Sequence, residues 1–417
     1  MKKRTFLKTI GFGSIQLPLM SLSPPAWAQK PKKGESFWKQ IRADYDLKPE
    51  YTNLESGYYN IIPQPTLKAL QNQIAMINRE GSYYMRTVRL DNKQKVINQL
   101  ADVVGCDASN LILTRNTTES LNTVIKGMSW QKGDHVIYSE QEYGAMQQMI
   151  LQVALENQLN TTILSIPKDP KNDDEIVSLY KKAIQPETKL ILVSHMINIT
   201  GHILPIKKIC DMAHASGVQV LVDGAHCVGH FTFSIESLHC DYYGSSLHKW
   251  LAAPLGCGML YIDPKHHNSL SPLFAENVSL KNTIKRYGHI GTHPEYHDLA
   301  ILNAIDYLQL IEPKRKEKRL RYLTEYWTKS FKNHPNIYLE TPSDTKRFCG
   351  IATVGLKNVA PPDLASLLLH KHKIFTVAIN NSNVRGCRIT PNIFTTLEEL
   401  DQLIFALNTI DQEASKT

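Results

Sequence analysis

One lysine lies in unusual company within the segment DYYGSSLHKWLAAPLGCG, which spans residues 241–258. Lysine side chains mostly remain solvated, yet Lys249 stands between a histidine and Trp250, and small apolar residues follow. Apolar surroundings disfavour the charged form of an amine and leave it nucleophilic. Lys249 is therefore the first candidate for covalent chemistry in this chain.

Polar residues also follow several predicted strands at the points where those strands end. They are residues 114–118 (TRNTT), 140–143 (EQEY), 194–198 (SHMIN), 223–226 (DGAH) and 245–249 (SSLHK). Ligands of an α/β sheet bind beyond the carboxyl ends of its strands. The sequence therefore predicts that hydroxyls, imidazoles, an acid and the lysine share one edge of a sheet.

Each of these polar residues also has a structural explanation. Asp223 could cap the turn after its strand, and His226 and His230 could be buried structural histidines. Together with His214 and Cys227 they could instead form a metal-binding cluster, although the chain contains no H-E-x-x-H motif and no paired C-x-x-C motif. No P-loop, no G-x-S-x-G and no strand-following G-x-G-x-x-G is present. We therefore predict no metal site.

The elements that must position these residues alternate between helix and strand. Helical patterns cover 66–80 and 92–105, and short β-rich runs cover 110–114, 134–140, 161–167, 188–196, 218–225 and 256–262. This alternation predicts an α/β fold with a mainly parallel sheet and helices on both faces. From about residue 296 the pattern changes to helices at 317–334 and 396–410 with strands at 349–356 and 374–379, which predicts a smaller α+β domain.

The first 28 residues have the pattern of an export signal. A basic start, MKKR, precedes the apolar run IGFGSIQLPLMSL and an A-x-A site that ends at Ala28. The run KKRTFLK resembles the twin-arginine motif S-R-R-x-F-L-K, with Lys3 in place of the first arginine, and a general secretory signal is the alternative. The apolar run is too short and interrupted to span a bilayer. We expect a periplasmic protein with no stable membrane span, exported by the twin-arginine route, which suits a folded protein if it carries a cofactor loaded before export.

Charge and cysteine content exclude other classes of protein. The formal charge of +8 falls to +4 without residues 1–28, and no concentrated basic stretch indicates a nucleic-acid partner. The seven cysteines are scattered, which predicts free thiols.

Several segments together resemble one enzyme family. LVDGAHCVGH and CDYYGSSLHKWLAAPLGCGMLY are similar to the pyridoxal-phosphate segment of class V aminotransferases, and the HKW form is closest to isopenicillin N epimerase-like members. RNTTESLNTVIKG, EYGA, NITGHILPI, RYGHIGT and RITPNIFTTLEELDQL match in the same order along nearly the whole chain. The resemblance implies an aspartate-aminotransferase-like fold, with an N-terminal segment at 29–60, a large cofactor-binding domain at 61–295 and a small domain at 296–417.

The resemblance also implies roles for individual residues around pyridoxal 5'-phosphate. Lys249 would form the Schiff base and Asp223 would pair with the pyridine nitrogen. Thr117, Thr118, Ser246 and His248 would bind the cofactor phosphate, and Tyr143, Asn198 and His226 would contact the cofactor ring. In a homodimer, Gly291 and Thr292 would bind the phosphate in the neighbouring subunit. Arg388 would clamp the substrate carboxylate, and Asn53 would line the substrate pocket. An internal ion pair is the alternative for Arg388.

The reaction class stays open between transamination and epimerisation of an amino acid or amino-acyl peptide. Cysteine desulfurases of this fold carry a nucleophilic cysteine in an R-x-G-x-x-C loop, but the corresponding stretch VAINNSNVRGCR has Asn380 and Asn381 there. Desulfuration by that route is therefore not expected. The alternatives are a lyase that tailors a secreted peptide such as a siderophore, a non-catalytic binding protein on the same fold, and a metal-binding protein.

Overall fold

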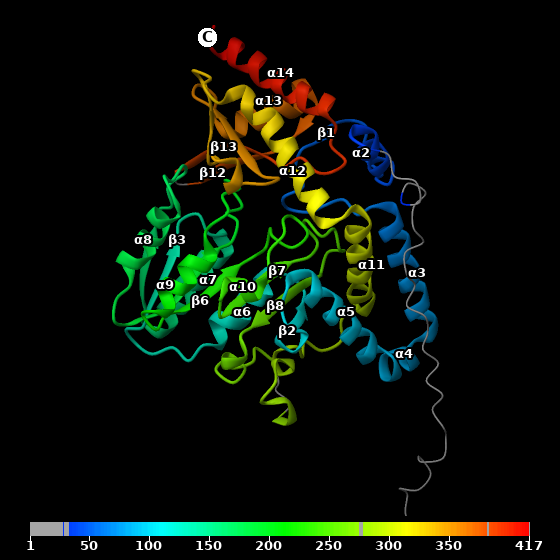
Figure 1. Cartoon of the computed structure of the whole chain (residues 1–417), viewed down its shortest axis with the longest axis vertical. Coiled ribbons are helices and arrows are strands. Elements are labelled where there is room, and N and C mark those ends of the chain that lie inside the picture. Colours follow the sequence, from blue (N-terminus) through cyan, green and yellow to red (C-terminus); the bar gives the residue numbers. More distant parts are fainter. Residues whose placement is uncertain (1–27, 29–32, 275–277, 382, 417) are drawn as a thin grey trace, which may run out of the picture.

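A seven-stranded mixed sheet forms the centre of the larger part of the protein (Figure 1). The computed structural model describes residue 28 and residues 33–274, 278–381 and 383–416. The strands lie in the order β2 (Leu111–Thr114), β8 (Gly258–Ile262), β7 (Tyr242–Ser246), β6 (Gln219–Asp223), β5 (Thr188–Ser194), β3 (His135–Ser139) and β4 (Asn160–Leu164). In this sheet β8 runs against the other six strands. The predicted α/β class with a mainly parallel sheet is thus confirmed.

Both faces of this sheet are covered, which explains why its inner strands, such as β5 and β6, are rich in consecutive apolar residues. Along β5, Leu190 and Leu192 face one hydrophobic cluster, with α6 (Thr117–Gly127) and α7 (Gly144–Asn157). Ile191 and Val193 face the other cluster, on the opposite side of the sheet. This second cluster contains residues of α5 (Arg89–Val104), α9 (Ile206–His214) and α11 (Glu295–Ile311). The period of two along the strand sorts neighbouring side chains into two layers.

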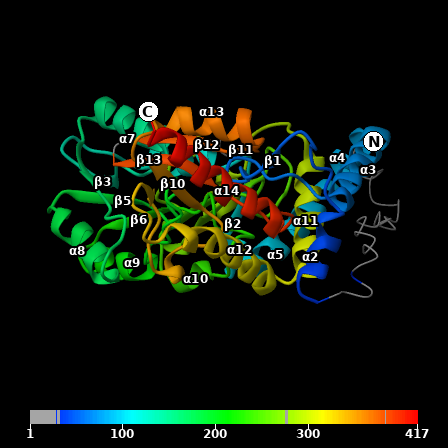
Figure 2. The same cartoon turned by 90° about the horizontal axis from the view of Figure 1, so that it is seen from above.

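A four-stranded antiparallel sheet forms the smaller part, in the order β12 (Val377–Asn381), β13 (Val384–Ile389), β10 (Ala352–Leu356) and β9 (Ile337–Leu339). Three helices pack on it: α12 (Pro313–Thr328), α13 (Pro361–His372) and α14 (Leu397–Ala414). Figure 2 shows α13 and α14 side by side over this part. The small α+β unit predicted from the C-terminal pattern is therefore present.

The N-terminal segment joins the two parts. Its helix α2 (Glu35–Arg42) contacts α12 and α14 through the ion pairs Glu35–Arg319 and Arg42–Glu399. Its strand β1 (Thr52–Asn53) pairs in parallel with β11 (Ile374–Phe375), as Figure 2 shows. The chain then enters α3 (Gln64–Glu80), which packs on α11.

The predicted domain boundaries and the predicted export signal both remain predictions. The helix α11, which follows the predicted boundary at 296, packs against α3 and α5 of the larger part, where Gln73 Nε2 donates to Asn303 Oδ1 at 2.6 Å. The predicted export segment lies outside the described residues apart from Ala28. No helix in the described ranges has both the length and the apolar character needed to cross a membrane.

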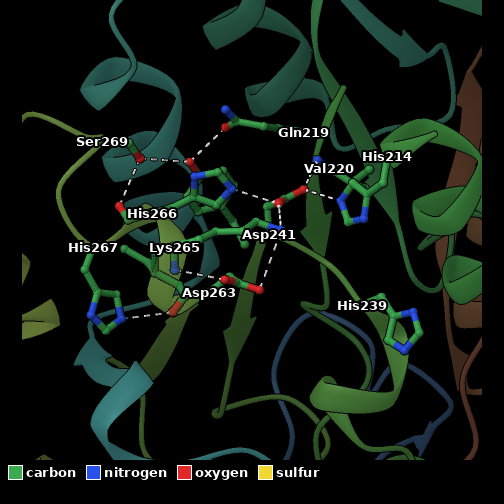
Figure 3. Close-up of polar contacts among 12 residues, drawn as sticks. His214, Gln219, Val220, His239, Asp241, Asp263, Lys265, His266, His267 and Ser269 are labelled. Carbon is green, nitrogen blue, oxygen red and sulfur yellow. Dashed lines mark hydrogen bonds and ion pairs between the residues drawn. The ribbon is translucent and has the colours of Figure 1, made fainter. Parts of the chain in front are cut away.

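A buried carboxylate fastens the amino-terminal edge of the large sheet (Figure 3). Asp241, directly before β7, accepts hydrogen bonds from Val220 N–H at 2.7 Å and from His214 Nε2 and His266 Nε2 at 2.8 Å each, and it pairs with Lys265 Nζ at 2.7 Å. Burial alone would raise its pKa, but the bonds from His266, Lys265 and His214 hold the pKa well below its usual range. Asp241 is thus a charged anchor on the side of the sheet away from the polar strand ends.

Candidate active site

The polar strand ends meet around one cavity at the carboxyl edge of the large sheet. The cavity, its open mouth included, measures about 810 Å³. Ten residues predicted from the sequence line it: Thr117, Thr118, Tyr143, Asn198, Asp223, His226, Ser246, His248, Lys249 and Arg388. The convergence follows from the parallel pairing of β3, β5, β6 and β7, which puts their carboxyl ends on one side.

Lys249 lies in the turn that follows β7, and its amine faces the cavity. Its Nζ atom is 3.1 Å from His226 Nε2. Burial lowers the pKa of Lys249 to about 8, and the opposing charge of Asp223 limits the shift. About a tenth of the amine is therefore neutral at pH 7, far more than for an ordinary lysine.

Asp223 ends β6 and is 6% exposed at the cavity wall. Its Oδ1 accepts the Ala225 N–H at 2.9 Å. Burial raises the pKa of Asp223, while this bond and the charge of Lys249 act against the rise. A buried carboxylate held in place in this way suits a ligand that presents a cationic ring N–H.

The amino end of α6 forms a cradle for an anion. Asn116 caps the helix, and its side chain accepts the Glu119 N–H. The first-turn N–H groups of a helix have no intrahelical partner and favour negative charge. Ser246 Oγ lies 3.0 Å from Thr117 N and 2.7 Å from Thr117 Oγ1, and His248 Nδ1 is buried with no hydrogen-bond partner among the described residues. These donors fit the phosphate of pyridoxal phosphate.

Arg388 forms the internal ion pair that the sequence left as an alternative. Its Nε and Nη2 donate to the two carboxylate oxygens of Glu55 at 3.2 and 2.6 Å, and its Nη1 donates to the Asn198 carbonyl at 3.2 Å. Gly57 gives the guanidinium room, because a Cβ there would lie 2.9 Å from it and Arg388 would have to shift. Arg388 still lines the cavity, so the ion pair holds its guanidinium at the wall.

Three predicted residues lie elsewhere in this chain. Asn53 does not line the cavity, because its Oδ1 accepts the Glu55 N–H at 3.0 Å and so holds the backbone that carries Glu55. Gly291 and Thr292 are exposed on the segment before α11. Their contact with a neighbouring subunit stays a prediction.

The structure adds acidic residues that the sequence did not single out. Glu55 lies two residues after the predicted Asn53, and Glu142 lies in the strand-end run EQEY. Glu142 is buried and accepts hydrogen bonds from Ser194 Oγ at 2.5 Å and Ser139 Oγ at 3.0 Å. Burial raises its pKa to about 7 despite these bonds. The position of Glu142 at the end of a predicted strand could have marked it as a site residue. The only sequence feature that could have marked Glu55 is that it lies close to Asn53.

The metal-like grouping considered from the sequence does not form. His214 is bonded to Asp241 at the amino edge of the sheet, whereas His226 lines the cavity at the carboxyl edge. Within the described ranges, one group of three has metal-ligand spacing: His293, Glu295 and Asp298. Arg89 pairs with Glu295 and Lys93 with Asp298, so two cations already neutralise its two carboxylates.

A sheet of this order, with a reactive lysine, a buried carboxylate and an anion cradle at its carboxyl edge, defines the class of enzymes that hold pyridoxal phosphate on a lysine. The chain belongs to the aminotransferase class-V family, whose sequence model matches residues 61–403. Pyridoxal phosphate is the cofactor expected for that family.

Individual relatives share this architecture. The chain is 27% identical over 397 residues to isopenicillin N epimerase of Streptomyces clavuligerus, which covers 90% of this chain and 99% of the relative. The apo structure of a cysteine desulfurase from Thermococcus onnurineus NA1 superposes with a TM-score of 0.78 at 20% identity, over 90% of this chain and 98% of that one. A C-DES variant with glycine covalently linked to its pyridoxal phosphate gives a TM-score of 0.77 at 18% identity, over 88% and 98% of the two chains. These structures establish the aspartate-aminotransferase-like fold.

Proposed function

We propose that this chain uses pyridoxal phosphate to act on the amino group of an amino acid or amino-acyl peptide, by transamination or epimerisation. The observation that carries the proposal is the Lys249 amine in a cavity that also presents Asp223 and the amino end of α6. Relatives at about 27% identity support the enzyme class and leave the substrate open.

The residues present fit the cofactor at each of its polar ends. Lys249 would hold its aldehyde carbon, Asp223 its ring nitrogen, and Thr117, Ser246 and His248 its phosphate. When bound, the cofactor supplies an electron sink for a carbanion at the substrate α-carbon. With a pKa of about 8, Lys249 Nζ can take a proton from that carbon and return it.

Arg388 is the proposed contact for the substrate carboxyl or amide carbonyl. Three of its N–H donors are used by Glu55 and Asn198, and a guanidinium has five. Tyr58 and Tyr143 line the same cavity and are 71% and 47% exposed, so they stand at its mouth. The open mouth gives room for a peptide that continues beyond the reacting residue.

The cysteines do not support persulfide chemistry in this chain. No cysteine is among the described residues that line the cavity. Cys387, next to Arg388, is fully buried and its Sγ contacts the Pro361 carbonyl at 3.6 Å. Burial raises its pKa to about 12, so its nucleophilic thiolate is scarce at neutral pH. Transamination, epimerisation and β-elimination remain as the reactions to distinguish.

The test of the proposed function begins with the visible spectrum. Purified protein should absorb in the visible range after addition of pyridoxal phosphate, and Lys249→Ala should abolish the absorbance. The matched control is Lys68→Ala, at an exposed position on α3, which should leave it unchanged. A wild-type protein that binds no cofactor would refute the proposal and favour a non-catalytic binding protein.

A substrate screen then separates the reactions. Amino acids and short peptides are incubated with the enzyme in deuterium oxide, and keto-acid release is measured together with exchange of the α-proton. Keto acid without ammonia indicates transamination, and exchange alone indicates epimerisation. Keto acid together with ammonia and the released side-chain substituent indicates a β-eliminating lyase.

We extend the proposal to a periplasmic homodimer that modifies a secreted peptide such as a siderophore. Gly291 and Thr292, exposed before α11, support shared active sites through the family resemblance. Sedimentation of the purified protein measures the oligomeric state, and a fusion reporter on residues 1–28 measures export. Comparing metabolites secreted by wild-type and deletion strains tests the substrate, and identical profiles would count against it.

A further inference from the structure

One histidine connects Lys249 with the tryptophan that follows it in sequence. His226 Nε2 lies 3.1 Å from Lys249 Nζ, and His226 Nδ1 lies 3.2 Å from Trp250 Nε1. His226 is 4% exposed and Trp250 is fully buried. Both ring nitrogens of His226 are therefore committed to protein partners, and water does not compete for them.

The indole of Trp250 decides which nitrogen of His226 carries the proton. An indole N–H can only donate a hydrogen bond, so His226 Nδ1 must accept and carry no proton. Burial lowers the pKa of His226 well below its ordinary value, so the ring is neutral. A neutral imidazole has one N–H, which here must be on Nε2. That N–H points to Lys249 Nζ, which can accept it only as the neutral amine, because an ammonium has no lone pair.

His230 fixes the arrangement from the other side. Its Nδ1 lies 2.7 Å from the His226 carbonyl, which can only accept, and its Nε2 accepts the Gly350 N–H at 2.7 Å. His230 therefore carries its proton on Nδ1, opposite to His226. Its ring stacks on Trp250 with centroids 3.6 Å apart at 17°. This stack fixes the plane of the indole and hence the direction of its N–H.

The main chain of Trp250 is held as well. Lys316, on α12 and 4% exposed, donates from Nζ to the Trp250 carbonyl at 2.5 Å. The smaller part of the molecule thus supplies two supports for the Lys249 turn, Lys316 to the backbone and Gly350 through His230.

We infer that Trp250 and His230 are positioning residues that fix His226 as an Nε2–H donor, and that this donor favours the neutral form of the Lys249 amine over its ammonium. The arrangement raises the fraction of Lys249 that is nucleophilic at a given pH. The use of that amine to capture a cofactor rests on the proposed function. The protonation pattern itself does not.

Other charges also act on the Lys249 amine. Asp223 at the end of β6 and Glu55 after β1 favour its protonated form, and Arg388 on β13 disfavours it. Cys227 favours the protonated form weakly, and His248 faces the lysine from the adjoining position. A variant that changes Trp250 leaves all of these groups in place, so it isolates the contribution of the His226 proton.

The first experiment locates the protons directly. Full-length protein labelled with ¹⁵N-histidine, without cofactor, is examined by long-range ¹H–¹⁵N NMR, with His226→Gln and His230→Gln for assignment. The expected spectrum shows His226 protonated on Nε2 and His230 protonated on Nδ1. A His226 protonated on Nδ1, or on both nitrogens at pH 7, would overturn the inference.

The second experiment measures the consequence at Lys249. The rate at which the cofactor-free protein captures pyridoxal 5'-phosphate is followed across pH, and its midpoint in wild type is expected at about 8. Trp250→Phe keeps the stack on His230 but frees His226 to accept from a lysine ammonium. We expect the midpoint to rise by about one pH unit and capture at pH 7 to slow about tenfold.

A matched variant completes this experiment. Trp130→Phe also removes one indole N–H, which donates to the Ile125 carbonyl at 2.8 Å, away from the cavity. Equal midpoints for Trp250→Phe and Trp130→Phe would overturn the inference. If Trp250→Phe does not fold, the NMR spectrum of the wild type decides. If the wild type captures no cofactor, the proposed function fails, and the spectrum still decides the protonation pattern.

Discussion

The ion pair between Glu55 and Arg388 gives the sharpest test of how the cavity is built. The two side chains are 4% and 7% exposed and meet through two hydrogen bonds of 2.6 and 3.2 Å. The variant Glu55→Gln keeps the size of the side chain and removes its charge. Arg388 is then buried without a counter-ion, which costs about 3–5 kcal/mol in comparable sites.

The expected loss is measured as the free energy of unfolding in urea, in a cycle with Arg388→Met and the double variant. Removing both charges leaves neither uncompensated, so the double variant should lose less than the sum of the single variants by about 2 kcal/mol or more. Glu413→Gln, which breaks an exposed ion pair with Lys371, is the control and should not shift the urea midpoint.

A ligand carboxylate should compensate for the missing charge. We expect acetate to raise the stability of Glu55→Gln in proportion to the logarithm of its concentration above the dissociation constant, with little effect on wild type. Additive losses within about 0.5 kcal/mol, together with no response to acetate, would refute the reasoning that Glu55 neutralises Arg388.

Two further variants test charges at opposite edges of the sheet. Glu142 has a pKa raised to about 7 by burial, so the folded state binds its proton more tightly than the unfolded chain, and stability falls as pH rises from about 4.5 to about 7. The free energy of unfolding of wild type should therefore fall by about 3 kcal/mol more than that of Glu142→Gln as pH rises through this range. Urea unfolding at pH 5 and pH 8 measures both decreases, and equal decreases for the two proteins would contradict this expectation. Asp241 has a pKa well below its usual range, so its stabilisation is present above about pH 4 and is lost as pH falls further. Asp241→Asn should cost about 3 kcal/mol at pH 7 without altering the visible spectrum of the cofactor-bound protein, and a changed spectrum would contradict the separation of the two edges.

Local patterns were sufficient to predict the fold and the place of the site. The apolar strands and the polar runs at their ends brought Asp223, Ser246 and Lys249 to one edge, because parallel strands end on the same side. The direction of β8 was not predictable, since an apolar strand looks the same in either orientation. The fold class could be predicted because it depends on the spacing of apolar residues along the chain, and a single sequence shows that spacing.

Contacts between distant segments were harder to foresee. The partner of Arg388 is 333 positions away, and nothing in the spacing marks Glu55 in preference to Asn53. The Asn53 side chain instead accepts the backbone N–H of Glu55, two residues later. Asparagine side chains commonly form such hydrogen bonds with the nearby backbone. The proton positions on His226 and His230 depend on partners that only the folded chain supplies. Gly291 and Thr292 require a second chain.

The pairing of β1 with β11 also governs when the site can form during synthesis. Glu55 is synthesised well before β11 and before Arg388, which lies 333 positions later in the chain. Pairings of such large sequence separation form late and fold slowly. A nascent chain can assemble the large sheet first, but its N-terminal segment must wait for the C-terminal strands. The active site can therefore be complete only after β11 and β13 have been made and the N-terminal segment has joined them.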